Sequence, residues 1–187
     1  KRDQIPVLKM LGMGTVEWMA ERARQFAERG YRHLKVKLGA GKEKDLGSFM
    51  AIRENVGPGV TLTADFNGAY DSVTAIHIIE KLTPAGLTMA EQPVPATDLA
   101  GMAMVTAAVQ PLILADQSIN PADDVYRVAR HKAARAVSIK LLKLGGIRAS
   151  RAVVQACESV GLACHVGGTG STRLVEAAQA HFIGATP

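Results

Sequence analysis

Five charged residues recur along the chain at intervals of 24 to 28 residues, each at the end of an apolar, strand-like run. In chain order they are a base, three acids and a base: Lys37 in HLKVKLG, Asp65 in TLTADFN, Glu91 in LTMAEQP, Asp116 in LILADQS and Lys140 in AVSIKLL. Each interval is about the length of one strand, one helix and two loops. Packing poorly explains a charge where a buried parallel strand ends, whereas a barrel of alternating strands and helices builds its active site there. We therefore expect the five side chains to form one site.

The three carboxylates are expected to be neighbours, because Asp65, Glu91 and Asp116 end three successive strands. Three hard oxygen ligands with room for water and substrate suit Mg²⁺, which prefers octahedral oxygen coordination. Taken singly, each acid is better explained as a helix cap or a loop ion pair, and Asp65 before Asn67 and Gly68 would suit a turn. Three acids at matched strand ends favour a metal site instead.

The lysines add a possible base on each side of such a metal. Lys35 and Lys37 are two residues apart on one strand, so their side chains point to the same face. If that face is the barrel interior, repulsion and burial lower a lysine pKa and make the amine a base near neutral pH. Lys140 is expected across the barrel mouth from Lys37. A lysine whose head reaches solvent is the simpler interpretation for Lys42 and Lys143.

This set of residues suits proton abstraction next to a carboxylate. Such a carbon acid is very weak, and removing its proton places negative charge on the carboxylate oxygens. A divalent cation stabilises that charge as it forms, while a lysine takes the proton.

Strand and helix patterns alternate along the chain. Continuous apolar runs predict strands at residues 7–11, 34–38, 60–64, 87–90, 112–115, 136–141 and 162–166. Continuous rather than alternating hydrophobicity is typical of parallel strands buried on both faces. Thr15 and Asp71 are candidate helix N-caps, Gly161 is a candidate C-cap, and a last helix is expected at 171–182. The pattern predicts a single domain over residues 1–187 with about seven strand–helix units, one fewer than a closed barrel contains. It is either an incomplete TIM-type (β/α)-barrel or an open α/β sheet.

Composition narrows the class of protein. The chain has 187 residues, is 48% hydrophobic and carries a formal charge of +5. Its basic residues are dispersed, without the aromatic-interleaved stripe typical of nucleic-acid binding. No apolar run reaches the roughly 18 residues of a membrane span, and no signal peptide opens the chain. Cys157 and Cys164 lack metal-ligand spacing and suit free thiols. We expect a cytoplasmic protein that binds neither nucleic acid nor membrane.

The motifs HLKVKLG, ADFNGAY, EQP, LADQS and SIKLLKLGGI, in this order and spacing, resemble the enolase superfamily. Within it they resemble the mandelate racemase/muconate lactonizing enzyme family, muconate-lactonizing-enzyme subgroup. The resemblance runs from about Val7 to the end of the chain, and it implies that family's modified barrel. It also implies an N-terminal capping domain and a last barrel unit, neither of which this chain contains, and a homo-oligomer in the full-length form.

The resemblance implies a role for each site residue. Lys37 and Lys140 would be the acid/base pair, and Lys35 would tune Lys37. Mg²⁺ or Mn²⁺ would bind Asp65, Glu91 and Asp116. Three amide side chains would orient these ligands by hydrogen bonds: Asn67, Gln92 and Gln117. Gln117 stands where the family usually has glutamate, which alters a charge near the metal. The implied enzyme is an isomerase or lyase acting on a small carboxylate.

The substrate is less constrained than the chemistry. Gly167, Gly168 and Thr169 would flank it, and the GGT sequence resembles muconate cycloisomerases. The lack of an acid between His165 and Glu176 argues against dipeptide epimerases, whose substrates present an ammonium group. Other readings are a racemase or epimerase of amino-acid derivatives, an acid dehydratase, a phosphate-binding barrel that uses residues 167–172, and a truncated, non-catalytic binding module.

Overall fold

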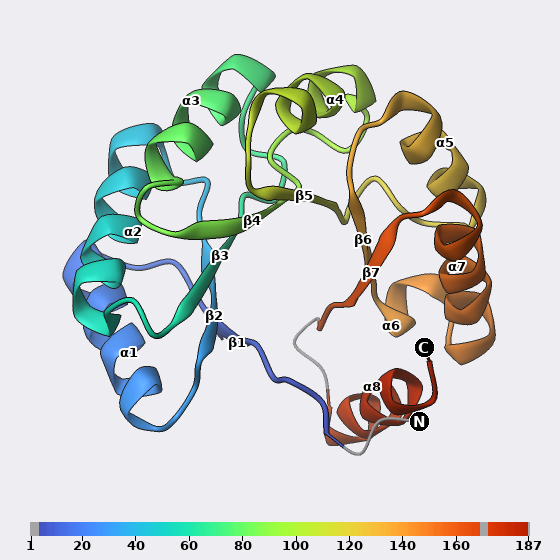
Figure 1. Ribbon diagram of the computed structural model, residues 1–187. Coiled ribbons are helices and arrows are strands. Elements are labelled where there is room, and N and C mark those ends of the chain that lie inside the picture. Colours follow the sequence, from blue (N-terminus) through green and yellow to red (C-terminus); the bar gives the residue numbers. More distant parts are fainter. Residues whose placement is uncertain (1–3, 169–171, 187) are drawn as a thin grey trace.

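Seven parallel strands form a single curled sheet with helices on its outside (Figure 1). A computed structural model describes residues 4–168 and 172–186, so Thr169 and Ser171 lie outside the described residues. The elements in chain order are β1 Lys9–Leu11, α1 Val16–Glu28, β2 His33–Lys37, α2 Lys42–Val56, β3 Thr61–Asp65, α3 Ser72–Leu82, β4 Leu87–Glu91, α4 Leu99–Ala108, β5 Leu112–Ala115, α5 Asp123–His131, β6 Ala136–Ile139, α6 Leu141–Leu144, α7 Ile147–Val160, β7 Ala163–Val166 and α8 Arg173–Ala185.

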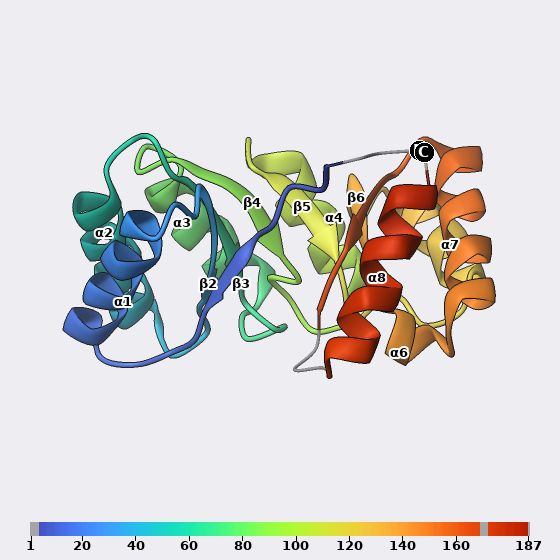
Figure 2. The same ribbon diagram turned by 90° about the horizontal axis from the view of Figure 1, so that it is seen from below.

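Each strand pairs in parallel with the next one in the sequence, from β1 to β7. In Figure 1 the strands form an inner arc, and helices α1 to α5 and α7 form an outer arc around it. Within the described residues β1 and β7 do not pair with each other, and α8 lies beside α6 in both views (Figure 1, Figure 2). The prediction of an incomplete TIM-type barrel with about seven units is confirmed, and the open-sheet alternative is wrong.

Side-chain alternation along β2 separates the core from the barrel interior. Leu34, Val36 and Leu38 are fully buried in the main hydrophobic cluster, which also contains Phe49 of α2. Because successive strand residues point to opposite faces, Lys35 and Lys37 face the interior. The core therefore lies between strands and helices and holds the strands in place, which leaves the inner face for polar residues.

Local sequence signals set the ends of several elements. The Thr15 hydroxyl accepts a hydrogen bond from Trp18 N at 3.2 Å, and Asp71 accepts one from Thr74 N at 3.0 Å, as predicted for N-caps. Gly161 ends α7 in the left-handed conformation at φ 71°. Within residues 4–168 and 172–186, none of the helices is long and apolar enough to cross a membrane.

Candidate active site at the ends of the strands

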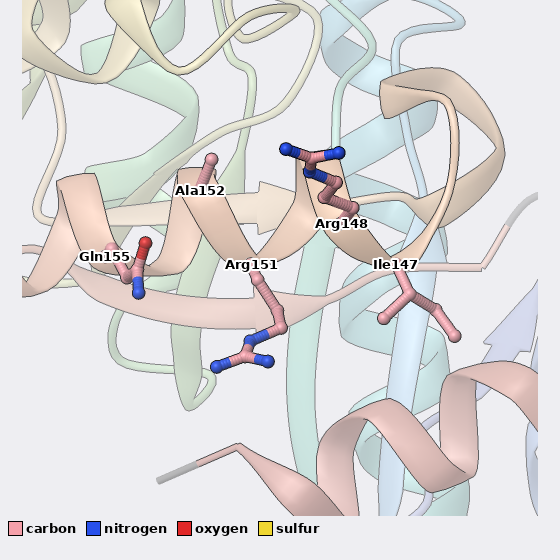
Figure 3. Close-up of a pocket in the computed structure, with 5 residues that line it drawn as sticks. All are labelled: Ile147, Arg148, Arg151, Ala152 and Gln155. Atoms are coloured by element: carbon pink, nitrogen blue, oxygen red, sulfur yellow. The ribbon is translucent and has the colours of Figure 1, made fainter.

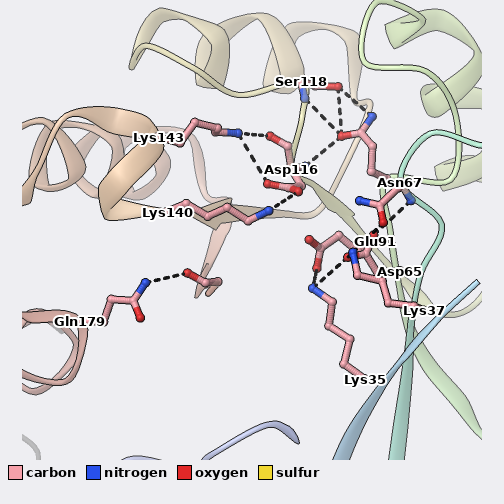
Figure 4. Close-up of polar contacts among 12 residues, drawn as sticks. Lys35, Lys37, Asp65, Asn67, Glu91, Asp116, Ser118, Lys140, Lys143 and Gln179 are labelled. Carbon is pink, nitrogen blue, oxygen red and sulfur yellow. Dashed lines mark hydrogen bonds and ion pairs between the residues drawn. The ribbon is translucent and has the colours of Figure 1, made fainter. Parts of the chain in front are cut away.

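The structure brings the five regularly spaced charged residues to one end of the barrel. Lys37, Asp65 and Glu91 are the last residues of β2, β3 and β4 and lie in register with one another. Asp116 directly follows β5, and Lys140 directly follows β6. Figure 4 shows their side chains converging from different sides of the barrel. The regular spacing in the sequence thus corresponds to neighbouring positions in space.

The two lysines of β2 bind the first two carboxylates. Lys37 Nζ lies 2.7 Å from Oδ2 of Asp65 and donates a hydrogen bond to Oδ1 of Asn67 at 2.6 Å. Lys35 Nζ forms an ion pair with Oε2 of Glu91 and lies 3.3 Å from Oδ2 of Asp65. The Lys35 side chain is 8% exposed, whereas that of Lys37 is 23% exposed. Lys35 is therefore the buried member of the pair.

The carboxylates of Glu91 and Asp65, rather than the ammonium group of Lys37, have the larger effect on the charge of Lys35. Burial alone would lower its pKa, but the negative charges of Glu91 and Asp65 outweigh burial and raise the pKa above its ordinary value. The expectation of a lowered pKa is therefore wrong for Lys35. Burial also opposes ionisation of Asp65, yet Lys35 and Lys37 hold the pKa of Asp65 below its usual value. Burial raises the pKa of Glu91 to about 7, against the attraction of Lys35.

Two further lysines converge on Asp116. Lys140 Nζ lies 2.5 Å from Oδ2 of Asp116. Lys143 Nζ donates to the main-chain oxygen of Asp116 at 2.7 Å and lies 3.5 Å from its Oδ1. The expectation that the head of Lys143 extends into solvent is wrong, because its ammonium binds Asp116, although the residue as a whole is exposed. Burial lowers the pKa of Lys143, and the charge of Lys140 adds to this effect against the attraction of Asp116. Its position three residues after Lys140 is the sequence signal for this residue.

Gln92 links the loops after β4 and β5. Its Oε1 accepts hydrogen bonds from the backbone N–H groups of Asp116, at 2.9 Å, and Ser118, at 3.2 Å. Its Nε2 donates to the carbonyl of Val94 at 3.0 Å and to the Ser118 hydroxyl at 2.9 Å. Gln92 is fully buried and has a φ of 40°, in a region where non-glycine residues are uncommon and often functional. Ser118, which no sequence pattern singles out, is part of this link.

The other two residues expected to orient the ligands differ from each other. Asn67 has a φ of 48°, and its backbone N–H donates to Oδ1 of Asp65 at 3.1 Å. Asn67 is therefore hydrogen-bonded to both Asp65 and Lys37. The Oε1 atom of Gln117 is buried and has no hydrogen-bond partner among the described residues. The structure therefore places Asn67, but not the side chain of Gln117, in hydrogen-bond contact with a candidate ligand.

The carboxylates have free oxygens that suit a cation. Oε1 of Glu91 and Oδ1 of Asp116 are buried without a hydrogen-bond partner among the described residues, and Asp65 is 1% exposed. Lys143 forms an ion pair with Oδ1 of Asp116 at 3.5 Å but no hydrogen bond to it. Buried carboxylate oxygens without a close donor are costly unless a cation neutralises them, so these atoms fit a hard divalent ion. Over the described ranges, no three acidic, histidine or cysteine groups are already gathered closely enough to form a ligand set. Oε2 of Glu91, Oδ2 of Asp65 and Oδ2 of Asp116 form ion pairs with Lys35, Lys37 and Lys140, respectively.

The segment after β7 lies beside Lys140. A Cβ atom on Gly167 would lie 2.7 Å from Oγ of Ser138 and 3.2 Å from Cε of Lys140, whereas a Cβ on Gly168 would meet nothing within 4 Å. Gln179 of α8 donates a hydrogen bond to the Gly167 carbonyl at 3.1 Å (Figure 4). Gly167 therefore leaves the space through which the Lys140 side chain passes. Thr169, predicted to contact substrate with both glycines, lies outside the described residues.

His165 stands in no motif of the sequence, yet it lies near Lys140 and Asp116. It lies on β7 in register with Ser138 of β6. Burial lowers its pKa to about 4, and the positive charges of Lys35 and Lys140 add to this effect against the attraction of Asp116. The imidazole is therefore neutral near pH 7.

A separate depression of about 490 Å³ lies along the outer face of α7. It is lined by Ile147, Arg148, Arg151, Ala152 and Gln155 (Figure 3). None of the charged residues at the strand ends contributes to it, and we assign it no role in the chemistry.

Comparison with known proteins gives the family. Residues 18–187 match the enolase C-terminal domain-like family. The chain is 35% identical over 157 residues to the hydrophobic dipeptide epimerase of Enterococcus faecalis, which covers 84% of this chain and 44% of the relative. It is 30% identical over 189 aligned residues to muconate cycloisomerase 1 of Rhodococcus opacus, which covers 100% of this chain and 50% of the relative.

Solved structures agree with these relatives. The dipeptide epimerase of E. faecalis complexed with Mg and the dipeptide L-Leu-L-Tyr superposes with a TM-score of 0.96 at 33% identity, over 98% of this chain and 52% of that one. A substrate-liganded L-Ala-D/L-Glu epimerase from Bacillus subtilis gives the same TM-score at 31% identity, over 99% of this chain and 52% of that one. The chain thus spans about half the length of the relatives it matches. The chain belongs to the enolase superfamily, as an enolase C-terminal domain-like barrel of the mandelate racemase/muconate lactonizing enzyme type.

Proposed function

We propose that this barrel catalyses proton transfer at the carbon next to the carboxylate of a small substrate. The observation that carries the proposal is the placement of Lys37 and Lys140. Each contacts a different carboxylate of the same buried group, Asp65 for Lys37 and Asp116 for Lys140, and they reach it from opposite sides of the barrel (Figure 4). A substrate held at that group would have a lysine on each side of its reacting carbon.

Each residue of the site has its own role in this mechanism. Lys37, in its neutral form, accepts the proton from one face, and Lys140 holds or delivers a proton at the other. Lys35 stays charged between Glu91 and Asp65 and holds these two carboxylates in place beside Lys37. Asp65, Glu91 and Asp116 would hold a divalent ion, Mg²⁺ or Mn²⁺, which would supply electrophilic stabilisation of the charge that develops on the substrate carboxylate.

The facing lysines favour racemisation or epimerisation of an amino-acid derivative. Inversion at one carbon requires a base on one face and an acid on the other, and the two lysines provide both. Relatives named as dipeptide epimerases and as an N-succinyl-L-Arg/Lys racemase support this reaction class. In these reactions the lysines exchange roles according to which enantiomer is bound.

A muconate-cycloisomerase-like reaction is the second candidate. Gly167 and Gly168 after β7 favour it, together with the 30% identity to muconate cycloisomerase 1. That reaction needs proton transfer at one face only. Substitution of the two lysines should therefore distinguish the candidates.

The test is solvent exchange followed by NMR in D₂O with Mg²⁺. The panel contains dipeptides, N-succinyl amino acids and cis,cis-muconate, tested with the parent protein and with Lys37→Met and Lys140→Met. For an epimerase, each variant should lose isomerisation but retain α-proton exchange with one stereoisomer, a different one in each variant. For a cycloisomerase, one lysine should be essential and the other should affect the rate far less. The exposed Lys81→Met is the matched control. Near-normal turnover in both site variants would refute the lysine mechanism.

A further inference from the structure

We propose that Lys143 is a positioning residue that fixes Asp116 while Lys140 is free to act on the substrate. This inference rests on the proposed function, because it concerns the same carboxylate group. The two lysines differ in what they bind: among the described residues the Lys140 ammonium binds the carboxylate of Asp116, whereas the Lys143 ammonium also donates to its main-chain oxygen.

The main-chain contact fixes the end of β5. The carbonyl of Asp116 accepts the Lys143 ammonium at 2.7 Å and also the backbone N–H of Ile119 at 3.0 Å. On the other side of the residue, the backbone N–H of Asp116 donates to Gln92. Both backbone polar groups of Asp116 are therefore held by groups that do not need to move during proton transfer.

The same contact sets the position of Lys140. Lys143 belongs to the short helix α6, which begins directly after Lys140 and ends at Gly145 with a φ of 85°. A hydrogen bond from Lys143 to Asp116 ties this helix to the end of β5. The main chain that carries the proposed acid/base Lys140 is thereby held beside the proposed metal ligand Asp116, as Figure 4 shows.

These contacts give Lys140 and Lys143 different roles. To reach a substrate carbon, the Lys140 ammonium must leave Oδ2 of Asp116. Without Lys143, the metal alone would then orient the Asp116 carboxylate. Lys143 stays on the main-chain oxygen, 3.5 Å from Oδ1, and so maintains the orientation of Asp116. Residues that orient a metal ligand typically contribute about 10- to 100-fold to metal affinity.

Two effects of removing Lys143 oppose each other. Loss of its positive charge would strengthen the attraction of the site for a cation, whereas loss of its hydrogen bond would let Asp116 reorient. The positioning role requires that the second effect be the larger. The direction of the change in metal affinity therefore tests the inference.

The experiment is a Mn²⁺ titration of the protein without substrate, followed by the EPR signal of free Mn²⁺. The variants are Lys143→Met, which removes the ammonium but keeps an unbranched side chain, Lys143→Arg, which retains charge and donors, and the exposed Lys81→Met as control. We expect Lys143→Met to weaken Mn²⁺ binding by about tenfold, Lys143→Arg to restore most of it, and Lys81→Met to match the parent. Thermal unfolding midpoints in metal-free buffer should stay within about 3 °C of the parent, a shift that corresponds to about 1 kcal/mol for a chain of this length.

The outcomes separate this inference from the proposed function. Unchanged or tighter Mn²⁺ binding by Lys143→Met would overturn the positioning role and leave the metal site intact. A loss of affinity that Lys143→Arg does not restore, or that accompanies a large fall in the unfolding midpoint, would show a merely structural role and overturn it as well. Absence of saturable Mn²⁺ binding by the parent would refute the proposed metal site, and this role with it.

Discussion

Lys35 and Lys37 converge on the same atom, Oδ2 of Asp65, at distances of 3.3 and 2.7 Å. The two ammonium groups leave one strand on the same face and are held together by the negative charge between them. Lys35 is the more deeply buried and also pairs with Glu91, whereas Lys37 reaches Asn67 at the rim. This asymmetry makes Lys35 the counter-charge of the two carboxylates, whereas Lys37 is the lysine that the proposed mechanism requires to release Asp65 and meet a substrate.

The asymmetry predicts unequal losses of stability. In metal-free buffer at pH 8, Lys35→Met should lower the free energy of unfolding by about 3 kcal/mol, because it leaves buried Glu91 and Asp65 without their common counter-charge. Lys37→Met should cost about 1 kcal/mol, because its side chain is more exposed and Lys35 still neutralises Asp65. Urea denaturation measures both changes. Equal losses in the two variants would contradict the assignment of Lys35 as the structural lysine.

The space around Lys140 predicts a separation of turnover from metal binding. Gly167→Ala would place a methyl group 2.7 Å from Oγ of Ser138 and 3.2 Å from Cε of Lys140, so the lysine must shift. We expect a fall in kcat of at least about tenfold, since small misplacements of a reacting group are costly. Mg²⁺ affinity should be unchanged, because Gly167 is not in contact with the carboxylates.

Gly168→Ala is the matched control for this prediction. A Cβ there meets nothing within 4 Å, so the Lys140 side chain should keep its position and kcat should fall much less than in Gly167→Ala. If Gly168→Ala lowered kcat as much as Gly167→Ala, the effect would belong to the chain after β7 in general and not to the position of Lys140.

The sequence was sufficient to predict where the charges gather, for a simple physical reason. The faces of these parallel strands that pack against helices are apolar, so most charged residues stand where a strand ends, and Lys35 within β2 points instead to the barrel interior. In parallel strands those ends lie together. Lys37, Asp65 and Glu91 are accordingly the last residues of their strands. Helix caps such as Thr15 and Asp71 were predictable because they depend on residues three positions away.

Interactions that depend on side-chain reach across the barrel were not predictable. The raised pKa of Lys35 requires Glu91 of β4, two strands away, and the role of Lys143 requires the loop after β5. Neither contact leaves a local pattern in the sequence. The N-terminal limit of β1 also differed: residues 7–11 were expected, whereas only Lys9–Leu11 pair with β2.

Gln92 provides a test of how the loops hold the site. Gln92→Ala should cost about 2 kcal/mol in the free energy of unfolding, because the backbone N–H of Asp116 loses its hydrogen-bond acceptor in a buried position. Mg²⁺ affinity should fall by about tenfold, as Asp116 is no longer held. Urea denaturation and isothermal titration calorimetry measure the two effects. Gln92→Glu is not a matched control for this test. It keeps the acceptor oxygen, but it loses the donor to Val94 and places a further negative charge near Asp116. Normal metal affinity in Gln92→Ala would show that Asp116 is fixed by other contacts.

Tyr70 predicts a pH-dependent contribution to stability outside the metal site. Its hydroxyl donates to Oδ2 of Asp45, whose carboxylate also accepts the backbone N–H groups of Gly39 and Ala40, so the pair braces the loop after β2. Burial raises the pKa of Tyr70 to about 12, and the hydrogen bond to Asp45 adds to this effect.

Because the folded protein favours the protonated phenol, the sign of the pH effect is fixed. The stabilisation is complete below pH 10, the ordinary pKa of tyrosine, and is lost as the pH rises from 10 to 12. Tyr70→Phe should therefore reduce the free energy of unfolding by about 1.5 kcal/mol at pH 8, the usual value for a hydrogen bond to a charged group. Above pH 10 the difference from the parent should narrow. Tyr31 and Tyr126 remain in both proteins, so their titration cancels in the comparison. A difference that stayed constant between pH 8 and pH 11.5 would show that Tyr70 stabilises the loop through packing alone.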